Sequence, residues 1–141
     1  MFEPTREQAR NTFFEAWRKY RAGQLLAGIE ALALEVVLAH PEYHDALSHP
    51  ERSRDRDYAD ESNPFLHMSL HVALEEQLSI DQPPGIAARF SALASKFQDR
   101  HEALHQALEC LAETVWRAQR DRAPPDAAAY LDCLATRALR K

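Results

Sequence analysis

One helical pattern occurs twice in the chain and carries two histidines each time. Residues 67–75 and 101–109 both read H-x-x-L-H-x-A-L-E. Helical residues four apart lie one above the other on a single face, so each pair can hold a metal ion through neutral imidazole nitrogens. If the two helices face each other, the pairs converge in one core. The pattern therefore predicts one metal site with four primary ligands, which are His67, His71, His101 and His105.

Three carboxylates are candidate further ligands, or partners that orient the imidazoles. Glu75 and Glu109 each lie one turn beyond a histidine pair, at the edge of the apolar stripe. Glu30 falls among apolar residues of a helix expected to be buried, where a carboxylate is costly unless it is paired or binds a metal. Alternatively, Glu30 is a surface residue in the first helical turn, where negative charge suits the helix dipole.

The segment His40-Pro41-Glu42-Tyr43-His44 supplies two more imidazoles just after that helix. Either histidine could enter the core, or both could face water, and we take His44 as the additional candidate ligand. Mixed histidine and carboxylate ligands suit iron, manganese or zinc, and they exclude a calcium cage made of oxygens alone. The H-x-x-x-H and H-x-x-x-E pairs resemble those of hemerythrin-like and other di-iron bundles. No organic cofactor is predicted.

Two other functions remain open. In the first, the histidines form a hydrogen-bonded core without metal, and an apolar helix face binds a partner protein or a second copy. In the second, residues 101–105 form the H-E-x-x-H motif of a zinc hydrolase, with Glu102 as general base. That motif needs a third ligand, for which Glu109 is too close on the same helix. No catalytic residue is assigned.

Composition indicates an ordinary soluble globular protein, with 141 residues, 45% apolar and 28% charged. The net charge of −5 argues against nucleic-acid binding, which depends on an excess of Lys and Arg. No apolar run is long enough to cross a membrane, and residues 1–6 do not begin a signal peptide. Cys110 and Cys133 suit reduced thiols better than a disulfide framework. We expect a cytoplasmic protein that could form a homodimer or bind a protein partner.

Helical periodicity and proline breaks predict an all-α bundle of five or six helices in a single domain, residues 1–141. The expected helices cover residues 4–22, 25–39, 64–78, 86–97, 100–120 and 127–138. Asn63 and Pro64 form a sharp helix start, as N-cap and first helical residue. Asp99 and Asp126 are predicted caps of the last two helices. Residues 49–62 are dense in charge and are expected to form a solvated loop.

Several segments together resemble one bacterial family. They are Asn63 to His71 (NPFLHMSLH), His40 to His44 (HPEYH) and Asp81 to Ile86 (DQPPGI), and residues 13–17 and 124–131 fit as well. The family that they resemble is known only as domain of unknown function 1841, and the similarity covers nearly the whole chain. The resemblance implies a small bacterial protein and carries no activity, and no catalytic residue, to transfer.

Overall fold

The structure, a computed structural model, describes residues 6–59 and 63–139, and for Arg6 the backbone alone. The expectations for residues 4–5 and 60–62 lie outside these ranges. Every regular element of the described part is a helix, which confirms the all-α class. The chain divides into two compact units, Met1–Val72 and Ala73–Lys141. The expectation of a single domain stays a prediction.

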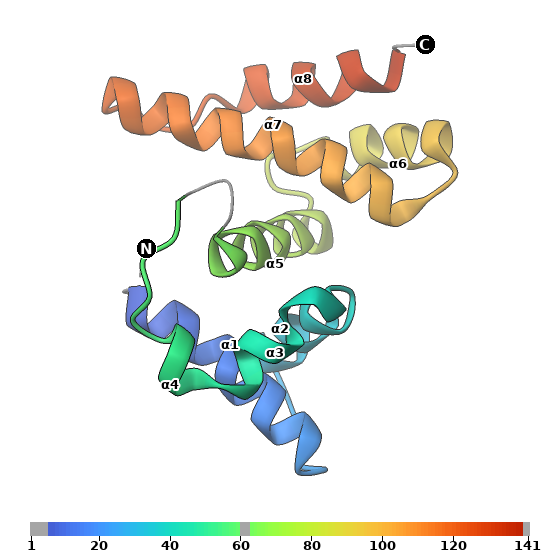
Figure 1. Ribbon diagram of the computed structural model, residues 1–141. Coiled ribbons are helices and arrows are strands. Elements are labelled where there is room, and N and C mark those ends of the chain that lie inside the picture. The colour runs from blue at the N-terminus through green and yellow to red at the C-terminus, as the bar shows by residue number, and fades with distance from the viewer. Residues whose placement is uncertain (1–5, 60–62, 140–141) are drawn as a thin grey trace. The chain divides into compact units, whose positions relative to one another are not determined.

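The described residues form eight α-helices rather than five or six. They are α1 Arg6–Arg21, α2 Ile29–Leu38, α3 His44–Ser48, α4 Pro50–Ser53, α5 Pro64–Ile80, α6 Ile86–Phe97, α7 Arg100–Asp121 and α8 Ala127–Leu139, with a 3-10 helix at Pro41–Tyr43 (Figure 1). The six longer helices correspond to the expected ones, except that α2 begins at Ile29 and not at Leu25, which is exposed. The two additional helices, α3 and α4, are too short to show a helical period in the sequence. None of the described helices has the length and apolar character needed to cross a membrane.

A cluster of buried apolar side chains holds the first unit together. Its members come from α1 (Phe13, Phe14, Ala16), α2 (Ala33, Val36, Val37), α3 (Leu47) and α5 (Phe65, Met68). The rings of Phe14 and Phe65 lie 5.4 Å apart between centroids, while α1 packs along α2 and α3 (Figure 1). Burial of Phe65 and Met68 therefore decides which face of the first turns of α5 is turned inward.

The start of α5 is capped as predicted. The side-chain oxygen of Asn63 accepts hydrogen bonds from the backbone N–H groups of Phe65 and Leu66, at 3.0 and 3.2 Å. Pro64 stands at the first helical position, where its missing N–H costs nothing. This cap sets the register of α5, and with it the places of the histidines that follow.

The charged segment after His49 is more ordered than its composition indicated, because it contains α4 and wraps around a buried arginine. Arg10 of α1 is only 3% exposed, and its guanidinium donates to the carbonyl oxygens of Ser53 (3.3 Å), Arg54 (2.9 Å) and Arg56 (2.8 Å). The same group lies 4.6 Å from the centre of the Phe65 ring. The expectation of a purely solvated loop was wrong here, because a partner distant in sequence binds the backbone of the segment.

In the second unit α6, α7 and α8 pack against one another (Figure 1). The predicted caps are confirmed, since Asp99 accepts from the N–H groups of His101 and Glu102, and Asp126 accepts from that of Ala129. The expectation of reduced cysteines was wrong: Cys110 of α7 and Cys133 of α8 form a disulfide, with their Cα atoms 5.8 Å apart. The pairing depends on how two helices face each other, which the spacing of the cysteines does not reveal.

We predict that Arg10→Met lowers the free energy of unfolding by about 2–4 kcal/mol, because it removes a charged donor from three backbone carbonyls. Arg18→Met is the matched control, since the Arg18 side chain is exposed and pairs with Glu15 on the surface. The control should lose no more than about 0.5 kcal/mol. Urea unfolding measures both, and equal losses in the two variants would contradict the role given to Arg10.

Asp81 predicts a component of stability that depends on pH. Its carboxylate accepts hydrogen bonds from the N–H groups of Ala87 (2.9 Å) and Gly85 (3.2 Å), which lower the pKa of Asp81 in that order of importance. This contribution is present above the unfolded pKa of about 3.9 and is lost as the pH falls through the lower folded value. Asp81→Asn keeps an acceptor oxygen but does not titrate. The free energy of unfolding of the Asp81→Asn variant should fall less between neutral and acidic pH than that of the wild type. Urea titrations at several pH values measure both, and parallel profiles against pH would refute the prediction.

Candidate metal centre

Three imidazoles converge in the first unit. His67 and His71 lie one turn apart on α5, and His40 lies just beyond the end of α2. One ring nitrogen from each lies within 4.8 Å of the others. The ring of His40 is 5.0 Å from that of His67 and 4.6 Å from that of His71, between centroids. His40 and His71 are buried, and His67 is half-buried. The α5 pair predicted from the sequence is thus joined by a third histidine from another element.

The spacing within the α5 pair suits a shared ion. The Nε2 atoms of His67 and His71 lie 3.2 Å apart. Zinc binds imidazole nitrogen at about 2.0–2.1 Å, so two nitrogens on one tetrahedral ion lie about 3.3 Å apart. A hydrogen bond between two neutral rings has nearly the same length. The pair is therefore placed for metal binding or for an N–H···N bond.

The orientation of His40 follows from the end of α2. Its Nδ1 lies 2.7 Å from the carbonyl oxygen of Val36, in the last turn of that helix. A carbonyl only accepts, so Nδ1 carries the hydrogen, and the lone pair of a neutral ring is then on Nε2. Histidines that bind metals usually donate their second ring nitrogen in this way, which fixes both tautomer and orientation.

His44 is used differently from what the sequence analysis expected. Its Nε2 donates to the carbonyl of Val37 at 2.8 Å, and its ring stacks on Trp17 with centroids 4.2 Å apart. The structure does not bring His44 into the group of three imidazoles, and it does bring His40 there. The missed signal is positional: His40 directly follows the last turn of an apolar helix, from where its side chain reaches back to an unpaired helical carbonyl.

Each of the three candidate carboxylates forms an ion pair. The pairs are Glu30 with Lys19 at 2.7 Å, Glu75 with Arg100 at 2.9 Å, and Glu109 with Arg137. Glu30 is half-buried in the first turn of α2, which agrees with the alternative given for it above. A nearby cation on another helix satisfies each carboxylate, so neither a ligand role nor a role in orienting the imidazoles follows from their positions.

The second predicted pair lies on α7, in the second unit. The rings of His101 and His105 meet edge to face, with their centroids 4.2 Å apart and their planes inclined by 62°. The predicted contact across one helical turn is thus present. Glu102, the candidate general base, is exposed, and its carboxylate accepts from the amide of Gln106. The joining of the two histidine pairs in one core stays a prediction.

Tyr43 is a neighbour of the imidazoles that the sequence analysis did not single out. Its ring stacks on that of His40 at 5.6 Å and stands edge-on to that of His67 at 6.2 Å. Burial, followed by the charge of Glu42, raises the pKa of the Tyr43 hydroxyl. A neutral phenol therefore borders the three imidazoles at neutral pH.

Comparison with known proteins supports the resemblance seen in the sequence. No curated protein and no solved structure matches the chain. Residues 5–136 match the family described as domain of unknown function (DUF1841), which covers nearly the whole chain. The protein therefore belongs to the DUF1841 family.

Proposed function

We propose that this protein binds a transition-metal ion through His40, His67 and His71. The observation that carries the proposal is the convergence of three imidazole nitrogens within 4.8 Å of one another. Two elements supply them, and the Val36 carbonyl sets the tautomer of His40. Three neutral nitrogens suit zinc or iron better than manganese, which favours oxygen ligands. A bacterial, cytoplasmic setting, expected from the resemblance and composition, belongs to the same proposal.

A site with three protein ligands leaves one coordination position open, as catalytic zinc sites do and closed structural sites do not. A metal ion held there supplies Lewis-acid chemistry to whatever ligand enters that position. The neutral phenol of Tyr43 borders the site and is available as a hydrogen-bond donor. The proposal therefore favours a metal centre that interacts with an exogenous molecule over a purely structural ion.

A hydrogen-bonded histidine core is the second candidate function, and the same 3.2 Å contact between His67 and His71 favours it. In that case one ring donates and the other accepts, and the cluster stabilises the unit without a metal. The zinc-hydrolase alternative has less support, since Glu102 is bonded to Gln106 on the surface of α7.

We predict that tag-free protein purified without chelator contains about one equivalent of zinc or iron. His67→Gln and His71→Gln should lose most of that metal, because each removes one of three ligands. His49→Gln is the matched control, because it makes the same exchange at a half-exposed histidine whose Nδ1 donates to the Asp45 carbonyl. Elemental analysis with competitive titration against a chromogenic chelator measures the effect.

The same experiment separates the alternatives. A wild type that is free of metal and refuses added zinc and ferrous ions, with His71→Gln changing only the urea midpoint, would support the hydrogen-bonded core. His105→Gln tests the predicted second pair: metal content falls if α7 contributes a ligand, and stays unchanged if the three imidazoles of the first unit suffice.

A further inference from the structure

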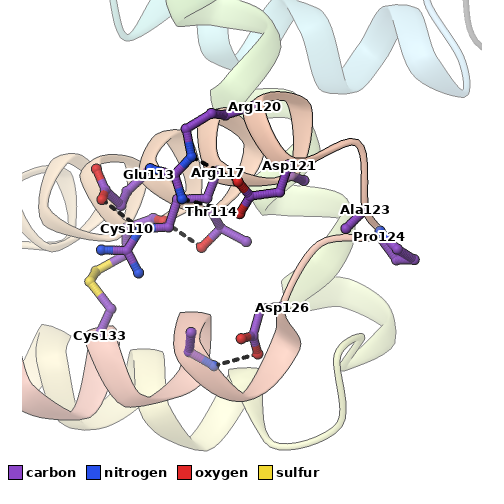
Figure 2. Close-up of a pocket in the computed structure, with 12 residues that line it drawn as sticks. Cys110, Glu113, Thr114, Arg117, Arg120, Asp121, Ala123, Pro124, Asp126 and Cys133 are labelled. Atoms are coloured by element: carbon purple, nitrogen blue, oxygen red, sulfur yellow. Dashed lines mark hydrogen bonds and ion pairs between the residues drawn. A yellow bond between two sulfur atoms is a disulfide. The ribbon is translucent and has the colours of Figure 1, made fainter.

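The disulfide of the second unit lies in the wall of a cavity. Cys110 and Cys133 both line a hollow of about 520 Å³ between α7 and α8. Figure 2 shows the disulfide at one end of the lining and the connection through Ala123 and Pro124 at the other. This space is large enough for a small molecule to approach the sulfur atoms without opening the helices.

The two cysteine residues differ in their exposure to solvent. Cys110 is 1% exposed, whereas Cys133 is half-buried. A disulfide is broken by a thiolate that must reach one sulfur directly, so access selects which sulfur is attacked. Exposure therefore assigns Cys133 as the attacked sulfur and Cys110 as the leaving group.

The charged groups that line the cavity are largely paired. Arg117 binds Glu113 at 2.8 Å, and Arg120 binds Asp121 at 2.9 Å (Figure 2). Asp126 adds one further carboxylate and accepts from the N–H of Ala129. The lining carries guanidinium groups as well as carboxylates. An incoming thiolate therefore does not meet the repulsion that a purely acidic surface would exert.

Contacts other than the disulfide also attach α8 within its unit. Arg137 donates to the side-chain oxygen of Gln106 at 2.8 Å, and Tyr130 donates to that of Gln77 at 2.7 Å. Tyr130 and Leu134 are also buried. Breaking the sulfur–sulfur bond therefore leaves α8 packed, with the two cysteines still close enough to pair again.

We propose that Cys110 and Cys133 form a reversible thiol-exchange site that accepts small monothiols at Cys133. A monothiol thiolate attacks Cys133 Sγ, the protein disulfide breaks, and the Cys110 sulfur leaves as a thiolate that takes up a proton. A second monothiol attacks the mixed disulfide, releasing the Cys133 thiol and a small-molecule disulfide. Two electrons thus pass from two monothiols to the protein, and a small disulfide oxidant reverses both steps.

The test uses the full-length native protein and reduced glutathione as the monothiol. Samples are quenched with an alkylating reagent, and peptide mass spectrometry locates the adduct. The expected result is a glutathione adduct on Cys133, followed by two free thiols, with helical circular dichroism retained and the disulfide restored by oxidised glutathione. Reduction that occurs only at urea concentrations that unfold the protein, or an adduct on Cys110, would overturn the proposal.

Single-cysteine variants provide a matched comparison. Cys110→Ser leaves Cys133 as the lone thiol, and Cys133→Ser leaves Cys110. We expect the first variant to react with oxidised glutathione at least about tenfold faster than the second, because reactivity follows access. Equal rates in two folded variants would contradict the assignment of Cys133. If either variant fails to fold, the position of the glutathione adduct in the wild type still tests whether Cys133 is the sulfur that is attacked.

Discussion

The carboxyl end of α2 is the constraint on which the candidate metal centre depends. A helix leaves its last carbonyls without intrahelical partners, and two of them here belong to Val36 and Val37, whose side chains are buried in the core. A buried carbonyl without a donor is costly. The Val36 carbonyl accepts from the His40 ring, and the Val37 carbonyl accepts both from the backbone N–H of His40 at 3.0 Å and from the His44 ring at 2.8 Å. Helix termination thus fixes the rings of both histidines.

The same two valines connect the helix end to α5. Their side chains belong to the same apolar cluster as Phe65 and Met68 of α5. His67 and His71 follow on that part of α5 and meet His40 there. Hydrophobic burial brings the three imidazoles together, and the hydrogen bond to Val36 decides which nitrogen of His40 faces the other two.

The contacts within each histidine pair were predictable from the sequence, but the set of residues that forms the candidate site was not. The contact of His67 with His71 follows from their four-residue spacing, as does that of His101 with His105. The choice between His40 and His44 depended on which helical carbonyl each ring reaches, and a linear pattern does not contain that information. The ion pairs of the three carboxylates were not predictable for a similar reason, since Lys19, Arg100 and Arg137 come from distant positions in the sequence.

The sequence by itself determined the all-helical class, the six long helices and their caps at Asn63, Asp99 and Asp126, because these depend on neighbours within about one turn. Only the tertiary structure decided the burial of Arg10 against the charged segment, the pairing of Cys110 with Cys133 and the entry of His40 into the cluster. Each of these joins residues far apart in the chain or at a helix end. Packing and the need to satisfy buried polar groups determine which residues become partners. The local spacing of residues in the sequence contains no information on either requirement.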